Sequence, residues 1–132
     1  ILSLINLCKY LIKKYNIKKN NILGHSDIAF DRKKDPGEKF PWELLARKGI
    51  GIWHNISQKK LRKFRKQKIY YDDKKKTKIF FRKIGYFTHN ISNRSYLNLT
   101  KSFQRRFRQE LVNGKIDKEC MIIAEKLSKL YS

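Results

Sequence analysis

Apolar residues recur at spacings of three and four in three separate segments of this 132-residue chain. Such a period lines up side chains on one face of an α-helix, so each segment is expected to form a helix with one buried face. The first of these helices is expected to pack on a sheet. The residues are Ile1, Leu4, Ile5, Cys8, Leu11, Ile12 and Tyr15 in the first segment, Leu99, Phe103 and Phe107 in the second, and Cys120, Ile123, Ala124, Leu127 and Leu130 or Tyr131 in the third.

Turn and cap residues mark the ends of these segments. Asn20 and Asn21 predict a turn after the first helix, and the apolar run Ile22-Leu23-Gly24 then predicts a short buried strand. Asn113-Gly114 predicts a tight turn, and Asp117 is the expected N-cap of the last helix. We therefore expect an α/β arrangement of helix, short strand and loop over residues 1–56, and a small all-α module of three helices over residues 79–132.

The stretch between these parts, residues 57–78, is a predicted basic linker. It is a dense run of Lys and Arg, interrupted by Leu61, Phe64, Ile69, Tyr70 and Tyr71. A run of like charge repels itself, which favours a solvated helix followed by a flexible joint. The alternative is an anion-binding strip, in which aromatic rings stack on bases or sugars while lysines hold phosphates. The sequence leaves both interpretations open.

The segment from Gly24 to Gly37 contains one histidine and three aspartates, and a lysine stands two residues before the last of these, Asp35. Neutral imidazole and carboxylate are both ordinary zinc ligands, and a lysine places a fixed positive charge beside a metal. A histidine beside serine and aspartate is also commonly a hydrogen-bonded loop residue, and Asp35-Pro36-Gly37 is an ordinary turn signal. The residue types alone do not decide between these interpretations.

The order of residues in this segment resembles the C-terminal zinc-binding segment of the type 2 N-acetylmuramoyl-L-alanine amidases. These zinc enzymes cut the bond between muramic acid and the first peptide residue of peptidoglycan. The similarity continues through Lys39-Phe40-Pro41-Trp42 and on to Gly49-Ile50-Gly51-Ile52-Trp53. Phe30, Asp31 and Lys34 depart from the family pattern, which alters the stiffness and charge of the loop.

Carried over to this chain, the resemblance implies that His25 and Asp35 bind Zn²⁺ and that Lys33 stabilises the oxyanion of the tetrahedral intermediate. Zinc lowers the pKa of a bound water toward ~7 and polarises the scissile carbonyl. An ammonium group nearby favours the developing negative oxygen. Ser26 and Asp27 also match the family string, and we interpret them as supports of the loop or as partners of His25.

Two parts of the family's catalytic site are expected to be missing. A catalytic zinc usually has three protein ligands, and this family takes its first histidine and its general-base glutamate from strands far upstream of the matching segment. The other histidines, His54 and His89, match no family ligand. The chain is therefore expected to be the C-terminal part of a truncated amidase domain, with a separate N-terminal amidase fragment as a candidate partner. The alternative is a catalytically inactive remnant that binds peptidoglycan.

The last third of the chain resembles the peptidoglycan-binding module that follows the catalytic domain in one branch of these amidases. The matching strings are Lys83-Ile84-Gly85-Tyr86, Ser102-Phe103-Gln104-Arg105-Arg106-Phe107-Arg108 and Asn113-Gly114-Lys115-Ile116-Asp117. This resemblance implies peptidoglycan or muropeptides as partners. It favours the cell envelope or periplasm as the location, with the cytoplasm as the alternative.

Composition sets limits on the remaining classes. The formal net charge of +22 is mostly lysine and comes with much Asn, Ile, Tyr and Phe, the mix that an AT-rich coding sequence produces. A basic nucleic-acid-binding protein is the second alternative, and we expect only non-specific, salt-dependent binding of nucleic acid. Cys8 and Cys120 are expected to be buried free thiols. No long uncharged apolar stretch is present, so no membrane span is expected.

Overall fold

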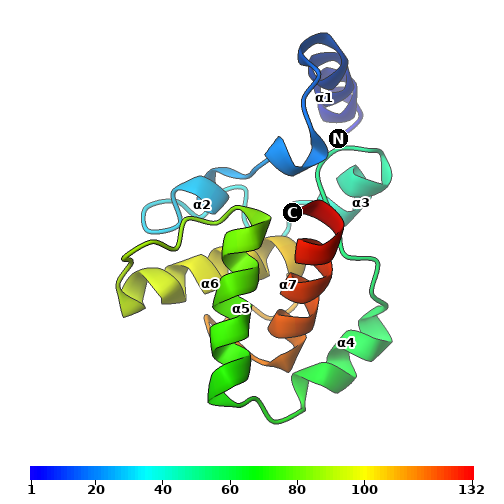
Figure 1. The fold of residues 1–132 in the computed structure, drawn as a ribbon. Helices are drawn as coiled ribbons and strands as arrows, with labels where there is room; N and C mark the ends of the chain where they lie inside the picture. The colour runs from blue at the N-terminus through cyan, green and yellow to red at the C-terminus, as the bar shows by residue number, and fades with distance from the viewer.

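The fold is entirely helical (Figure 1). The computed structural model describes residues 1–132, and its elements are α1 (Leu2–Tyr15), a 3₁₀ turn (Lys19–Asn21), α2 (His25–Ile28), α3 (Trp42–Arg47), α4 (Gln58–Arg65), α5 (Tyr71–Ile84), α6 (Asn93–Phe107) and α7 (Lys118–Tyr131). Helices α5 and α7 lie side by side, α4 packs against α7, and α2 contacts α6. Helix α1 projects away from this body.

The predicted α/β class is wrong, because the structure contains no strand. The backbone at Ile22 and Gly24 is extended, with φ/ψ of −97°/105° and −82°/158°. A strand also needs a neighbouring extended segment to complete its hydrogen bonds, and the chain supplies none. The Ile22 carbonyl instead accepts a hydrogen bond from Arg106 Nη2 at 2.9 Å. The local sequence therefore predicted the extended conformation correctly, whereas the predicted sheet is wrong.

The first predicted helix is confirmed as α1, although it packs on α3 and not on a sheet. Its single buried residue, Ile5, joins a small core with Trp42, Leu45 and Ile50. The helix ends where Asn16 adopts the left-handed conformation (φ 50°), which asparagine tolerates better than most residues. Much of its apolar surface stays in solvent, including Leu2, which is 71% exposed.

The main core draws on all three parts into which the sequence was divided, residues 1–56, 57–78 and 79–132. Helices α5, α6 and α7 supply most of it, and the rings of Phe81, Phe103 and Phe107 pack with centroids 4.7 and 5.2 Å apart. Phe30 and Ile52, from the first 56 residues, belong to the same cluster. Burying an apolar side chain of this size contributes about 1.5–3 kcal/mol. The region expected to be a partial amidase domain and the three-helix region therefore share one hydrophobic core.

Residues 57–78 form α4 and the first half of α5. Ser57 caps α4 by accepting a hydrogen bond from the Lys60 amide at 3.4 Å, and Leu61 is fully buried in the main core. At the end of α4, Arg65 donates to the fully buried Glu119 of α7 at 2.5 Å. The residues expected to form a linker thus contribute to the core, while the division of the chain into three parts stays a prediction.

The start of α7 is stabilised by buried charge. The predicted N-cap is confirmed, since the Asp117 side chain accepts from the Cys120 amide at 2.9 Å. Arg108 pairs with both Asp117 and Glu119, so Glu119 lies between two guanidinium groups, those of Arg65 and Arg108. Both cysteines are free thiols, as predicted; Cys120 is fully buried and Cys8 only partly.

His54 is a buried base at the join between α3 and α4. Its ring stacks on Trp53 with centroids 4.6 Å apart, and its Nδ1 accepts from the Ile56 amide at 3.1 Å. Its Nε2 has no hydrogen-bond partner. Burial disfavours the charged imidazolium and lowers the pKa of His54 to about 4.

We predict that this histidine makes the fold sensitive to mild acid. The unfolded chain binds a proton at His54 below about pH 6.5, while the folded chain does so only below about pH 4, so stability falls between these values. The shift corresponds to about 3 kcal/mol. Urea unfolding at a series of pH values should show a loss between pH 6.5 and 4 that is about 3 kcal/mol larger in the wild type than in His54→Gln. The exposed control His89→Gln should keep it, and equal pH profiles for the wild type and His54→Gln would contradict the prediction.

Candidate metal centre

The metal loop, residues 24–37, begins at a glycine that the packing requires. Gly24 precedes α2, and a Cβ atom built on it would lie 2.8 Å from Pro36 Cδ and 3.1 Å from the Trp42 ring. Its amide donates to Asp27 Oδ2 at 2.8 Å, which caps the short helix. The two ends of the loop can therefore approach each other closely, and His25 comes directly after the contact.

The structure brings the two predicted zinc ligands together. His25 Nδ1 lies 3.1 Å from Asp35 Oδ2, and the Ser26 amide donates to the Asp35 carbonyl at 2.9 Å. Both side chains are open to solvent, with 51% and 63% of their surface exposed. Two ligands of a tetrahedral zinc ion lie about 3.4 Å apart when each bond is about 2.1 Å long. The spacing and chemistry of this donor pair fit a zinc ion.

The pair is not joined by a third ligand of the chain. No group of three or more His, Cys, Asp or Glu side chains is close enough to hold a metal ion. His54, which sequence reasoning set aside, is buried against Trp53. The donor set present therefore accounts for two of the three protein ligands that a catalytic zinc site usually has.

Lys33 lies in the turn that leads from α2 to Asp35. Its amide donates to the Ala29 carbonyl at 2.8 Å, and its side chain is exposed. None of the ion pairs of the structure includes its ammonium group. Its role at the oxyanion stays a prediction.

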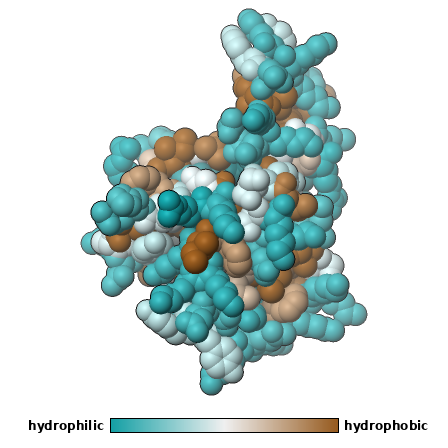
Figure 2. Space-filling view, in the orientation of Figure 1, coloured by the Kyte–Doolittle hydropathy of each residue, from teal (hydrophilic) through white to brown (hydrophobic).

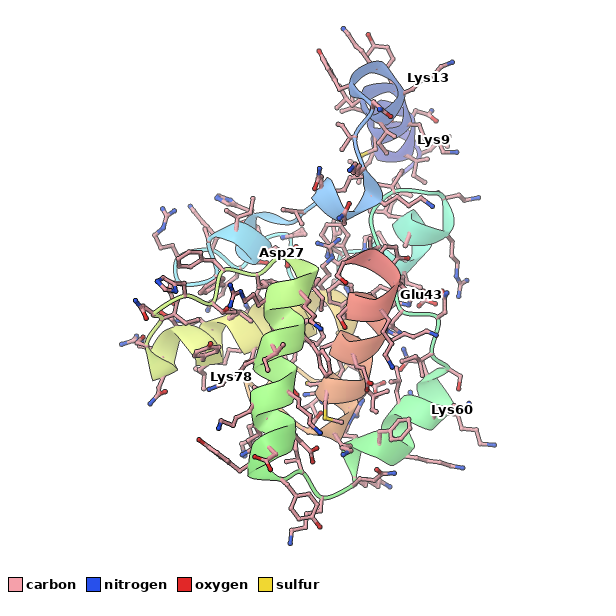
Figure 3. All side chains as sticks on the ribbon, viewed as in Figure 1. Lys9, Lys13, Asp27, Glu43, Lys60 and Lys78 are labelled. Atoms are coloured by element: carbon pink, nitrogen blue, oxygen red, sulfur yellow. The ribbon has the colours of Figure 1, made fainter.

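A buried polar cluster supports the loop from below. We call it the Asp27 cluster, and it consists of Asp27, Tyr86, Ser102 and Arg106. Asp27 Oδ1 accepts from the Tyr86 hydroxyl at 2.7 Å, and it lies 3.4 Å from the Ser102 hydroxyl oxygen. Asp27 Oδ2 accepts from Arg106 Nη1 at 2.6 Å. Figure 3 shows Asp27 where α2 meets the helices behind it. Burial, together with the charge of Asp27, raises the pKa of Tyr86 well above its usual value, so the phenol stays a donor.

Arg106 connects three parts of the N-terminal region. Besides Asp27, it donates from Nη2 to the Ile22 carbonyl, and its guanidinium carbon lies 4.2 Å from the centroid of the Trp42 ring. Cation–π contacts of desolvated groups contribute up to about 2 kcal/mol. A single side chain of α6 thus holds the segment before the metal loop, the loop itself and α3.

Helix α6 also contacts the loop at a second place. Asp31 accepts from the Ser95 hydroxyl at 2.8 Å and from Asn98 Nδ2 at 2.9 Å. These hydrogen bonds lower the pKa of Asp31, and the one from Asn98 has the larger effect. The Ser102 hydroxyl also donates to the Ser26 carbonyl at 2.8 Å. The loop is therefore fixed along its first half, while His25 and Asp35 stay exposed above it.

Sequence reasoning placed Ser26 and Asp27 as loop supports but missed the side chains that hold them. Tyr86 and Arg106 lie 59 and 79 residues away from Asp27 in the chain. Both stand in strings that were assigned to the peptidoglycan-binding module. The sequence around Tyr86 and Arg106 matched the module, but no pattern in it indicated that these two side chains contact the metal loop.

Comparison with known proteins agrees with the geometry. A family model described as N-acetylmuramoyl-L-alanine amidase matches residues 1–38. The N-acetylmuramoyl-L-alanine amidase AmiD of Escherichia coli (strain K12) is 35% identical over 132 residues, which are 99% of this chain and 48% of that protein. The 1,6-anhydro-N-acetylmuramyl-L-alanine amidase AmpD of Enterobacter cloacae is 49% identical over 40 residues, 30% of this chain and 21% of that protein.

Solved structures extend the likeness to the whole fold. A complex of E. coli AmiD with the substrate anhydro-N-acetylmuramic acid-L-Ala-D-gamma-Glu-L-Lys superposes with a TM-score of 0.82 at 34% identity, covering 98% of this chain and 51% of that one. AmpDh3 of Pseudomonas aeruginosa gives a TM-score of 0.78 at 30% identity, with coverage of 98% and 52%.

A loop that carries two donors of the zinc-binding type, held on a helical body of this fold, is similar to the corresponding part of these amidases. The resemblance to the N-acetylmuramoyl-L-alanine amidases seen in the sequence is confirmed, by the family model over residues 1–38 and by the E. coli relative over nearly the whole of this chain. The chain spans about half the length of the E. coli relative that it matches from end to end.

We predict that the fold tolerates the loss of one partner of the Asp27–Arg106 pair poorly. Arg106→Met leaves a buried carboxylate without its cation and should lower the free energy of unfolding by about 3–5 kcal/mol. The matched control is Arg47→Met, which breaks an exposed pair with Glu43 and should cost less than about 1 kcal/mol. Urea unfolding measures both. Similar small losses in the two variants would show that the buried pair does not hold the loop.

Proposed function

We propose that this chain is the metal-loop and wall-binding part of a peptidoglycan hydrolase of the N-acetylmuramoyl-L-alanine amidase type. The reaction is cleavage of the amide between N-acetylmuramic acid and L-alanine. The observation that carries the proposal is the contact between His25 and Asp35, in a loop that lies within the residues matched by the amidase family model. The titles of two related structures name muropeptide ligands, the AmiD substrate and an anhydromuramic pentapeptide with AmpDh3.

In this proposal His25 and Asp35 hold Zn²⁺, and Lys33 acts on the developing oxyanion. Zinc bound there would polarise the carbonyl of the scissile amide and lower the pKa of a water molecule bound to the metal. His25 ligates as the neutral imidazole, and Asp35 as the carboxylate. Preorganised positive charge at a developing oxyanion is worth about 2.7–4 kcal/mol in hydrolases of known mechanism. Asp27 and Arg106 do not touch the substrate; they fix the loop that carries the donors.

The proposal includes a separate N-terminal amidase fragment that supplies the third ligand and the general base. The two-donor set supports this, because it leaves the metal site open. Leu23 and Ile28, which flank His25, are 48% and 70% exposed, and exposed apolar patches mark interaction surfaces. Figure 2 shows hydrophobic atoms on the surface around α2 and beside α1.

A catalytically inactive peptidoglycan-binding protein is the second candidate. It is favoured by the same two-donor set, since no other His, Cys, Asp or Glu of the chain completes it. In both cases peptidoglycan or its muropeptides are the partner, and the cell envelope is the proposed place of action. No helix of the structure has the length and apolar character needed to cross a membrane.

Zinc titration of the purified chain tests the donor pair. We predict weak, stoichiometric binding of Zn²⁺ that is lost in His25→Ala and in Asp35→Ala, measured by calorimetry after chelator treatment. The control His89→Ala removes an exposed histidine outside the loop and should bind like the wild type. Zinc binding that survives both loop substitutions would contradict the proposed ligands.

Reconstitution of hydrolysis tests the activity. We predict that the muropeptide anhydro-N-acetylmuramic acid-L-Ala-D-gamma-Glu-L-Lys is cleaved when the chain, Zn²⁺ and an N-terminal AmiD-type fragment are combined. Lys33→Ala should lower kcat about 10²–10³-fold, whereas its exposed neighbour Lys34→Ala should leave kcat nearly unchanged. A zinc-loaded mixture without turnover would favour the inactive binding protein. Turnover by the chain and zinc alone would show that no second fragment is needed.

A further inference from the structure

Lysines form a stripe along the outer face of α4, away from the metal loop. Lys59, Lys63 and Lys66 follow one another at spacings of four and three, so they share one face of the helix, and all three are exposed. Leu61, which is buried in the main core, lies on the opposite face. Figure 1 shows α4 at the edge of the molecule, where it packs against α7. We call these three residues the lysine stripe.

No acidic side chain of the protein neutralises the lysine stripe. None of the ion pairs of the structure includes its three ammonium groups. The arginines of α4 differ, since Arg62 and Arg65 both pair with Glu110. The next acidic residue along the chain is Asp72, beyond the turn that follows α4. The arginines of this helix therefore pair within the chain, whereas its outer lysines pair with nothing in it.

The placement of these lysines is unfavourable for α4 itself. Lys59 and Lys60 stand in the first turn, which contains no acidic residue, although the positive end of the helix dipole disfavours cations there. Lys59 and Lys63 also repel each other at a spacing of four. The neighbouring helices α5 and α7 have acidic residues in the first turn, so a lysine-rich composition does not by itself explain the order in α4. Local sequence rules are typically broken where function requires it.

Two exposed tyrosines follow the lysine stripe in the chain. Tyr70 and Tyr71, at the turn into α5, are 59% and 73% exposed. Tyrosine is enriched where a membrane meets water, because its ring is apolar and its hydroxyl is polar. Lys68 and Lys75 each lie 5.1 Å from the centroid of one of these rings, so we assign them to the tyrosines and not to an external anion.

We propose that the lysine stripe binds the surface of a membrane that contains anionic phospholipids. Three ammonium groups on one straight helix face fit a flat layer of phosphate groups, and each lysine close to such a layer strengthens binding about fivefold. A single-stranded nucleic acid is held instead in a groove that follows its backbone, whereas the stripe lies on the outer face of a helix. The inference goes beyond the amidase reaction and does not depend on it, since neither the metal loop nor a muropeptide takes part.

Sedimentation with lipid vesicles tests the proposal on the full chain. The vesicles are phosphatidylcholine with about one third phosphatidylglycerol, and we expect binding that weakens as salt is raised and is absent with phosphatidylcholine alone. The variant Lys59→Glu/Lys63→Glu should lower the partition coefficient at least about tenfold. The matched control Lys9→Glu/Lys13→Glu reverses two lysines at the same spacing on α1, at the other end of the molecule in Figure 3, and should lower it less than about twofold.

The single variant Lys59→Glu separates binding from folding. A glutamate in the first turn suits the helix dipole and pairs with Lys63 four residues later, so the Tm of this variant should rise. Its binding to the anionic vesicles should weaken at the same time. A fall in both Tm and binding would overturn the proposal, because Lys59 would then serve the fold.

Three further outcomes would overturn it. Equal weakening in the two double variants, with thermal unfolding showing that both fold, would mean attraction by net charge alone. Equal binding to both kinds of vesicle would mean that phosphate charge is not recognised. A single-stranded oligonucleotide that displaces the vesicles at physiological salt, and that Lys59→Glu/Lys63→Glu fails to bind, would assign the lysine stripe to nucleic acid.

Discussion

The ion pair between Asp27 and Arg106 is the interaction on which the functional part of the structure depends. Both side chains are almost fully buried, at 5% and 3% exposure, so each loses most of its hydration. Such a pair is favourable only when further hydrogen bonds satisfy the remaining polar atoms. Here the Tyr86 hydroxyl and the Gly24 amide complete the shell of Asp27, and the Ile22 carbonyl completes part of that of Arg106.

This pair makes α6 a support of the candidate metal centre, although α6 contributes no donor atom to it. The metal loop has little structure of its own, since α2 is only four residues long. Its shape comes from contacts with α6 through Asp27, Asp31 and the Ser26 carbonyl, and from Phe30 in the main core. A region that resembles a wall-binding module therefore also serves as the scaffold of the loop, and removing it would leave His25 and Asp35 unsupported.

The sequence predicted features that depend on neighbours in the chain. The helical period of α1, α6 and α7, the cap at Asp117 and the contact of His25 with Asp35 all involve residues within ten positions of each other. The sheet was predicted wrongly, because a strand needs a partner that no local pattern reveals. The Asp27 cluster was missed for the same reason, since its contacts join residues 59 to 79 positions apart.

The contacts show that arginines and lysines contribute differently to the high positive charge of the chain. Most of the 11 acidic residues are engaged inside the chain, and the most buried of them, Asp27 and Glu119, pair with arginines. Arginine suits such joints because its planar group binds a carboxylate through several donors. Of the lysines, only Lys118 and Lys129 form ion pairs, with Asp73 and Glu125. The surface is therefore basic because 33 Lys and Arg residues outnumber 11 Asp and Glu residues, and lysines carry most of the charge that no acidic side chain pairs.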